Sequence, residues 1–283
     1  MKKKTKVLFI VFAVCFALGI AAGFIVFDKV INAPIEAKEP VSIKTSGFSD
    51  FSDVCLIGHR GFSAIAPENT NKSFKEACLA GFYGCEFDIH LTEDKKWVIM
   101  HDSRIKRMTG RRGVIEKMTL KQLKSIPLTN GANIENYGKI YMPTLEETLY
   151  LLSQYDVVPV IEIKTDTAEK LDEVLSLLEK HGFSERAWII SFNEAPLVRV
   201  RELDKKIKIS LLTERVNKKA VDFCLENNFD GLDFNHEKAG EKQVKMIIDA
   251  GLVPQTWTVD TVEDFEKFYS LGVRYFTGNC LTY

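Results

Sequence analysis

The chain has 283 residues, of which 46% are hydrophobic and 27% are charged. These values are typical of a globular protein with a substantial core, and the length allows one large domain or two small ones. The formal net charge is -1, so the sequence lacks the overall basic field that would favour nucleic acid as a partner.

The first segment of the chain predicts a membrane anchor. Residues 1–6 form a cationic tail, and the apolar residues 7–27 that follow contain no charged side chain. A run of this length can cross a bilayer as one helix, and lysine-rich flanks stay in the cytoplasm. We therefore expect a single-pass protein of the cell membrane whose remaining residues lie on the extracytoplasmic side. The alternative is a signal peptide that is removed from a secreted protein.

Residues 28–53 mix prolines, charged residues and serines without periodicity, which predicts a linker to a domain at residues 54–283. The domain contains five cysteines: Cys55, Cys78, Cys85, Cys224 and Cys280. Their number is odd, and no closely spaced pattern of metal ligands occurs among them. We favour buried thiols over one or two disulfides.

From residue 54 onward, short apolar runs alternate with longer amphipathic segments. The apolar runs predict eight strands: Val54–Gly58, Gly84–His90, Val158–Ile163, Ala187–Ser191, Lys208–Leu212, Gly231–Asp233, Val253–Trp257 and Arg274–Thr277. The segments between them predict helices: Thr70–Ala80, a helix opened by the capping box at Thr144–Glu147, Ala168–His181, Ala195–Leu203, Lys218–Asn227, Glu241–Ala250 and Thr261–Leu271.

This alternation predicts an α/β fold of the TIM (β/α)8 barrel type, preceded by the single transmembrane helix. A doubly wound sheet is the alternative, but no glycine-rich phosphate turn follows the first strand. Residues 103–142 exceed the length of a barrel connection and predict a small insertion after the second strand region.

A histidine and an arginine, His59 and Arg60, follow directly after Gly58 at the end of the first predicted strand. A second histidine, His101, ends another apolar run, Trp97–Met100. A fixed cation binds an anion, and two histidines beside one phosphate could remove a proton at one oxygen and supply one at another.

Acidic residues on the second and third predicted strands indicate a metal site. Side chains two apart share one face of a strand, so Glu86 lies with Asp88 and Glu162 lies with Lys164. Three carboxylates at strand ends suit a hard divalent cation, Mg2+ or Ca2+, and internal salt bridges are the alternative. His90 shares the face of Glu86 and Asp88 and is more typical of a structural residue than of a fourth ligand.

Several motifs together resemble one enzyme family. They are GHRG (Gly58–Gly61), APENT (Ala66–Thr70), CEFDIHLTED (Cys85–Asp94), VIMHD (Val98–Asp102), MPTLEETL (Met142–Leu149) and IEIK (Ile161–Lys164). Their order over residues 54–283 resembles the glycerophosphodiester phosphodiesterase family. The resemblance implies a TIM barrel with one divalent cation that hydrolyses glycerophosphodiesters to glycerol 3-phosphate and an alcohol.

The resemblance also implies roles for individual residues. It implies an acid/base pair of His59 and His101, phosphate binding by Arg60 and Lys164, metal ligation by Glu86, Asp88 and Glu162, and a substrate pocket that includes Glu68 and Trp257. We expect His101 to act as the base and His59 as the acid. The nucleophile, the alcohol and the choice between the two cations stay open.

The chain departs from the family pattern at a few positions. Asp260 stands where asparagine is common, Gly278–Asn279 varies the usual C-terminal aspartate, and Lys95–Lys96 stands where the family usually has a glycine-containing turn. One alternative function is a barrel phospholipase that acts on intact membrane phospholipid or phosphoinositide. Another is a non-catalytic binding module, although all the implied site residues are present. The expected partners are a small glycerophosphodiester and the membrane, and no protein partner is indicated.

Overall fold

The computed structural model describes residues 33–283. The expected transmembrane helix at residues 7–27 and the first part of the expected linker lie outside this range. Among residues 33–283, every helix is too short or too polar to cross a bilayer.

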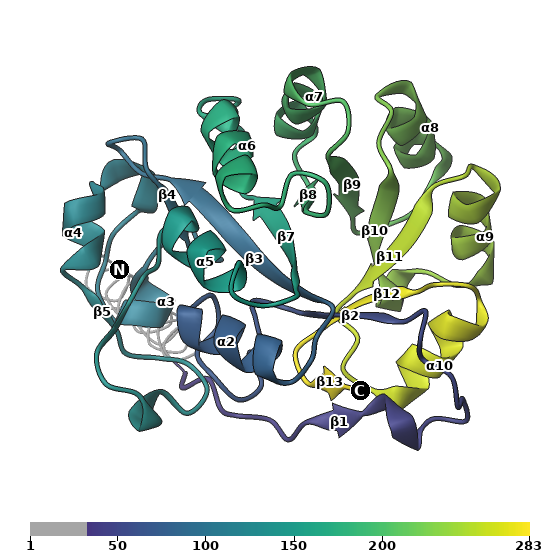
Figure 1. Ribbon diagram of the computed structural model, residues 1–283, viewed down its shortest axis with the longest axis horizontal. Coiled ribbons are helices and arrows are strands. Elements are labelled where there is room, and N and C mark those ends of the chain that lie inside the picture. Colours follow the sequence, from purple (N-terminus) through teal and green to yellow (C-terminus); the bar gives the residue numbers. More distant parts are fainter. Residues whose placement is uncertain (1–32) are drawn as a thin grey trace, which may run out of the picture.

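Eight parallel strands form a closed barrel within residues 33–283 (Figure 1). They are β2 (Cys55–Gly58), β3 (Gly84–Leu91), β7 (Val158–Ile163), β8 (Trp188–Ser191), β9 (Lys208–Thr213), β10 (Gly231–Asn235), β11 (Val253–Trp257) and β12 (Tyr275–Gly278). The pairing of β2 with β3 closes the ring, and each predicted strand range overlaps one of these strands. The predicted TIM-like barrel is therefore confirmed.

Helices connect successive strands and cover the outside of the barrel (Figure 1). They are α2 (Asn71–Leu79), α5 (Leu145–Leu152), α6 (Leu171–Lys180), α7 (Glu194–Leu203), α8 (Lys218–Glu226), α9 (Glu241–Asp249) and α10 (Val262–Ser270). Threonine caps start three of them, because the side-chain oxygens of Thr70, Thr144 and Thr261 each accept a backbone N–H of the first turn.

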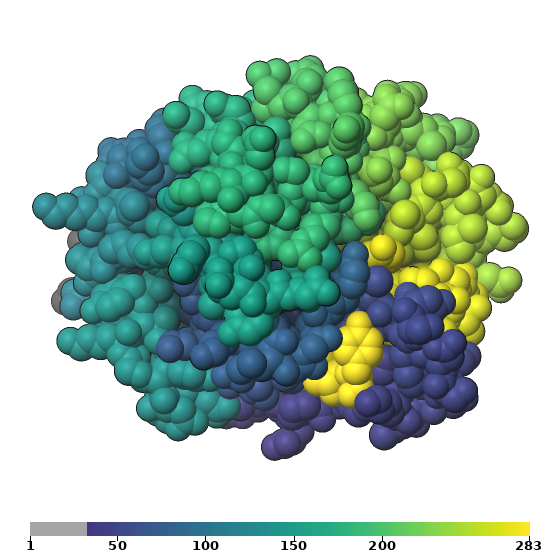
Figure 2. Space-filling model, in the orientation of Figure 1, coloured from purple at the N-terminus to yellow at the C-terminus, as the bar shows by residue number. Residues whose placement is uncertain are grey.

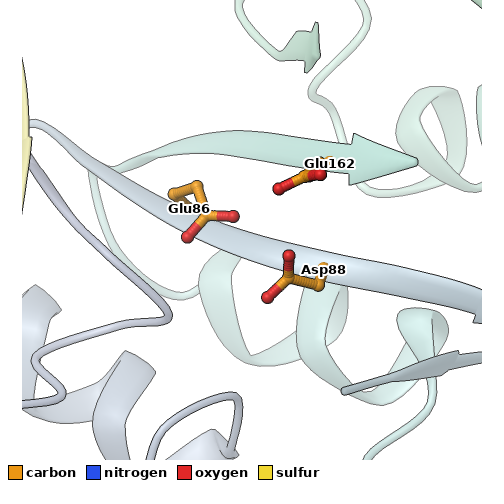
Figure 3. A group of neighbouring side chains, drawn as sticks. All are labelled: Glu86, Asp88 and Glu162. Atoms are coloured by element: carbon orange, nitrogen blue, oxygen red, sulfur yellow. The ribbon is translucent and has the colours of Figure 1, made fainter. Parts of the chain in front are cut away.

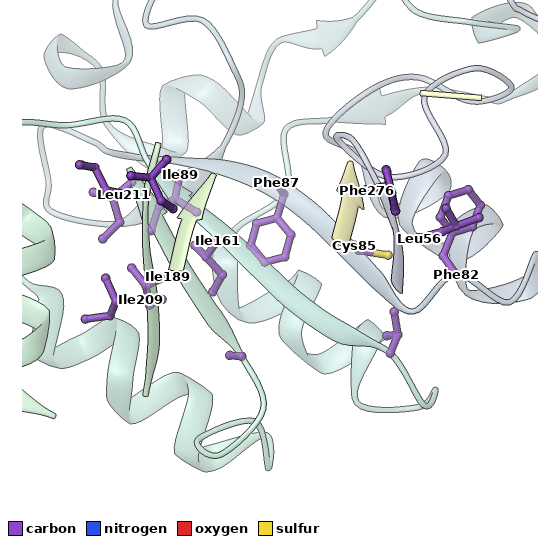
Figure 4. Packing of buried hydrophobic residues seen from close by; sticks show 14 of the residues in the cluster. Leu56, Phe82, Cys85, Phe87, Ile89, Ile161, Ile189, Ile209, Leu211 and Phe276 are labelled. Carbon is purple, nitrogen blue, oxygen red and sulfur yellow. The ribbon is translucent and has the colours of Figure 1, made fainter. Parts of the chain in front are cut away.

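The main hydrophobic core lies between the strands and these helices (Figure 4). On β3, Cys85, Phe87 and Ile89 are fully buried in this core. Burying each large apolar side chain contributes about 1.5–3 kcal/mol to folding. Since strand neighbours alternate in direction, this packing turns Glu86 and Asp88 toward the barrel interior.

A small subdomain follows β3. Strand β4 (Trp97–Ile99) pairs antiparallel with β3, and α3 (Lys106–Thr109), α4 (Leu120–Lys124), β5 (Pro127–Leu128) and β6 (Ile140–Tyr141) come before α5. These elements enclose a separate cluster of buried residues that includes Met100, Ile105 and Met108. His101 lies between β4 and α3, so the position of the residue depends on how the subdomain packs.

The N-terminal part of the described chain lies against the C-terminal residues. Strand β1 (Val41–Ser42) pairs with β13 (Leu281–Thr282), and Ile43 is fully buried. Figure 2 shows purple N-terminal residues beside yellow C-terminal ones on one face. Residues 33–53 were expected to belong to a linker. Part of that segment instead packs on the barrel, because Val41 and Ser42 pair with β13 and Ile43 is buried in the core. The five cysteines of the described chain are free thiols.

Candidate active site

The loop after β2 is a tight turn with two left-handed residues, Arg60 (φ 57°) and Gly61 (φ 78°). A Cβ at Gly61 would lie 2.6 Å from a backbone carbon of Ser73, so only glycine fits there. The turn directs the backbone N–H of Arg60 toward Glu86, whose Oε2 accepts it at 2.8 Å. His59 and Arg60 are thereby held above the acidic residues of β3.

Three carboxylates converge inside the barrel, as predicted. Glu86 and Asp88 extend from β3 and Glu162 extends from the adjacent β7 (Figure 3). One oxygen from each lies within 4.8 Å of the others, and all three residues are buried. Burial and the charges of Asp88 and Glu162 raise the pKa of Glu86 well above its ordinary value. Burial and the charge of Asp88 raise the pKa of Glu162 to about 8.

Two cations offset part of this negative charge. Lys164 Nζ lies 2.9 Å from Glu162 Oε1 and 3.4 Å from Asp88 Oδ1, and Arg60 Nε lies 3.7 Å from Asp88 Oδ2. Burial raises the pKa of Asp88, but Arg60, His101 and Lys164 together hold it below the ordinary value. Asp88 Oδ1 is nevertheless buried without a hydrogen-bond donor. The salt bridges expected as the alternative are therefore present beside the acidic cluster. The three carboxylates, with one buried oxygen that lacks a hydrogen bond, also fit a hard divalent cation.

His101 is oriented by its neighbour. Its Nδ1 lies 2.8 Å from Asp102 Oδ1, which leaves Nε2 available to a substrate. His90 does not join the acidic cluster, and its Nε2 lies 3.2 Å from the backbone oxygen of His101. His90 therefore helps to position His101, which agrees with the structural role expected for it.

Arg107, on α3 of the subdomain, ties two acidic residues together. Its Nε donates to Asp102 Oδ2 at 2.6 Å, while Nη1 and Nη2 donate to Glu68 at 3.0 and 2.7 Å. Glu68 also accepts a hydrogen bond from Arg60 at 2.9 Å. Arg107 thus holds both Asp102, which contacts His101, and Glu68, which contacts Arg60. Glu68 lies behind Arg60 rather than on the pocket wall.

Replacing Arg107 with methionine is expected to lower kcat about tenfold to a hundredfold, because Asp102 and Glu68 lose their shared donor and His101 shifts. Arg107→Lys should recover only part of the loss, since an ammonium cannot bind both carboxylates in this planar geometry. Steady-state kinetics measure the effect. Arg186→Met removes an exposed ion pair with Asp156 and serves as the matched control. Equal kcat in Arg107→Met and the control would contradict this role.

A pocket of about 130 Å³ opens beside these residues. Its wall includes polar residues His59, Arg60, Glu86, His101, Glu162, Lys164, Asp233, Thr258 and Thr277, and apolar residues Ile190, Phe192, Leu212 and Trp257. The rings of Phe192 and Trp257 meet edge to face, 5.6 Å apart. Both histidines therefore face one small space that has an aromatic side.

Asp233 is a pocket residue outside the set predicted from the sequence. It is 2% exposed, its Oδ1 has no hydrogen-bond partner, and burial raises its pKa to about 8. The predicted strand ended at this residue, so its place on the inward face between Gly231 and Asn235 was missed. The sequence does contain the pattern that places it there, because polar and apolar residues continue to alternate through Phe234.

Asp233→Asn is expected to stabilise the protein increasingly as pH rises. With a folded pKa of about 8 against an ordinary 3.8, Asp233 is protonated in the folded chain and ionised in the unfolded chain between these values. The contribution of this carboxyl to the free energy of unfolding is therefore complete at low pH. As pH rises between the two pKa values, the free energy of unfolding falls by up to about 1.4 kcal/mol per pH unit. Thermal melts from pH 4 to pH 8 should show the variant gaining on the wild type. A constant difference across this range would contradict the assignment.

Comparison with known proteins agrees with this geometry. Residues 59–279 match the model of the glycerophosphoryl diester phosphodiesterase family, a range that includes every predicted site residue. A glycerophosphodiester phosphodiesterase of Caldanaerobacter subterraneus subsp. tengcongensis is 31% identical over 225 residues, covering 77% of this chain and 90% of the relative. One of Bacillus altitudinis is 27% identical over 224 residues, covering 77% and 91%.

A solved structure has the same fold. It is an Oleispira antarctica phosphodiesterase in complex with the product sn-glycerol-3-phosphate, with a TM-score of 0.74 and 25% identity, and the match covers 84% of this chain and 96% of that one. The family match spans most of the described chain and contains the converging carboxylates and histidines. This chain is therefore an enzyme of the glycerophosphoryl diester phosphodiesterase family.

Proposed function

We propose that this protein hydrolyses glycerophosphodiesters to glycerol 3-phosphate and an alcohol by acid/base catalysis between His59 and His101. The observation that carries the proposal is that both imidazoles line one pocket with Arg60 and Lys164, beside the acidic cluster. The product bound to the Oleispira antarctica structure supports glycerol 3-phosphate as one product.

Arg60 and Lys164 supply positive charge for the phosphate. Each is only about 17% exposed at its side chain, so its attraction for an anion is less screened than at the surface. Glu86, Asp88 and Glu162 would hold one divalent cation, which supplies further charge to stabilise the oxygens of the phosphoryl group. Mg2+ and Ca2+ both suit this donor set.

The surroundings of the two histidines favour different roles. Burial and the nearby charge of Arg60 lower the pKa of His59 to about 4, so the ring is neutral at pH 7 and accepts a proton. Asp102 accepts the Nδ1 hydrogen of His101, which leaves Nε2 to donate a proton to the leaving alkoxide. This assignment, His59 as base and His101 as acid, reverses the expectation from sequence. The attacking oxygen belongs to water or to the glycerol 2-hydroxyl.

The full-length protein in detergent solution provides the direct test. It is incubated with glycerophosphocholine, glycerophosphoethanolamine or glycerophosphoglycerol and a divalent cation, and glycerol 3-phosphate is measured. We expect cation-dependent release, and none from His59→Ala. No release from any of these esters would contradict the proposal. Faster cleavage of intact phospholipid in vesicles than of the soluble esters would instead support the phospholipase alternative.

We also propose that residues 7–27 anchor the protein in the cell membrane, with the catalytic domain on the extracytoplasmic side. The support is the uncharged apolar run after a lysine-rich start. Protease added to intact cells should then degrade the domain while the membrane stays closed. A domain that is digested only after lysis would contradict this orientation.

A further inference from the structure

The C-terminal segment holds the ring of His59 on its Nδ1 side. His59 Nδ1 lies 2.8 Å from Asn279 Oδ1, and Asn279 Nδ2 donates to Asp260 Oδ2 at 2.8 Å. Asp260 Oδ1 also accepts the backbone N–H of Asn279 at 2.6 Å. Asp260 therefore fixes both the side chain and the backbone of the residue that faces His59.

These contacts determine where the hydrogens lie. A carboxylate only accepts hydrogen bonds, so the Asn279 amide must turn its NH2 group toward Asp260 and its oxygen toward His59. An amide oxygen also only accepts, so His59 must carry a hydrogen on Nδ1. The neutral ring consequently has an unprotonated Nε2, the form that a base requires.

The two backbone segments that carry Asp260 and Asn279 lie close together. The N–H of Val259, the residue before Asp260, donates at 2.9 Å to the backbone oxygen of Thr277, two residues before Asn279. A Cβ at Gly278 would lie 2.2 Å from the oxygen of Val259, so only glycine allows this contact. Lys38, from the segment before the barrel, adds an ion pair of 3.1 Å to Asp260 Oδ2. Asp260 is thus held by Asn279 and by Lys38.

We propose that Asn279 and Asp260 are positioning residues that fix the orientation and the tautomer of His59 for proton transfer, an inference that rests on the proposed function. Asn279 is the residue that contacts His59, and Asp260 holds Asn279 through both its side chain and its backbone.

Exchanging the two residue types tests this inference. Asp260→Asn and Asn279→Asp alone should each lower kcat about tenfold to a hundredfold with little change in KM, because the pair becomes two amides or two repelling carboxylates. The double variant D260N/N279D restores one acid and one amide, and the acid still accepts the Nδ1 hydrogen. Its kcat should return to within about fivefold of the wild type. Asp249→Asn, at an exposed ion pair with Lys245, is the control.

A second measurement does not depend on turnover. The 15N chemical shifts of the His59 ring should show the Nδ1–H tautomer in the wild type and a mixture of tautomers in Asn279→Ala. If the wild type fails to hydrolyse the esters but has this tautomer, the proposed function fails, whereas the fixing of the His59 tautomer by Asn279 stands. A double variant no more active than the weaker single variant, or an unchanged tautomer in Asn279→Ala, would overturn the inference.

Discussion

His101→Ala is expected to lower kcat on glycerophosphocholine by about 10²- to 10⁴-fold, the usual contribution of a general acid. The loss should be much smaller on a glycerophosphodiester whose alcohol is 4-nitrophenol, because this leaving group departs without being protonated. The reason lies in the contact of His101 with Asp102, which leaves one ring nitrogen to deliver a proton. Kinetics on the two substrates measure the difference directly.

His59→Ala is expected to affect the two substrates equally, unlike His101→Ala. A base is needed whatever group leaves, so this variant should lose a similar factor on both substrates. His181, which follows α6 and lies outside the pocket wall, supplies the matched control His181→Ala. If His59→Ala, rather than His101→Ala, recovered on the nitrophenyl ester, the two roles would be those expected from the sequence.

The parts of the site that could be predicted from sequence depend on local periodicity. Glu86 and Asp88 are two residues apart on one strand, so their shared inward direction follows from the alternation of side chains. Glu162 is opposite Asp88 in the register of two neighbouring strands, which the order of strands in a barrel already implies. The position of the acidic cluster therefore follows from strand positions alone.

The contacts that tune the histidines could not be predicted in this way. Asn279 meets His59 across 220 positions of sequence, and no periodicity links them. Arg107 reaches Glu68 only because α3 of the subdomain packs beside the barrel mouth. Residues 33–53 resemble a linker in composition, yet burial of Ile43 and pairing of β1 with β13 hold part of the segment on the barrel. Tertiary packing decides each of these cases.

Glu86→Gln is expected to abolish cation-dependent activity and at the same time to raise the melting temperature in EDTA. Without a cation, burial and the charges of Asp88 and Glu162 make an ionised Glu86 unfavourable. Glutamine has nearly the same shape, and its amide oxygen can still accept the N–H of Arg60. Removing a carboxyl group whose ionised form is unfavourable should therefore stabilise the cation-free protein by several degrees, since about 1 kcal/mol corresponds to about 2–4 °C in a domain of this size.

Added Mg2+ or Ca2+ should reverse this order. A cation that binds only the folded wild type raises its melting temperature by mass action, whereas the variant has lost one ligand and should respond little. Glu146→Gln removes an exposed carboxylate paired with Lys180 and should behave like the wild type. Thermal melts of the three proteins, in EDTA and across a series of cation concentrations, make the comparison. Equal stabilisation of Glu86→Gln and the wild type by the cation would show that Glu86 is not a ligand, and the buried carboxylates would then serve only as partners of Arg60 and Lys164.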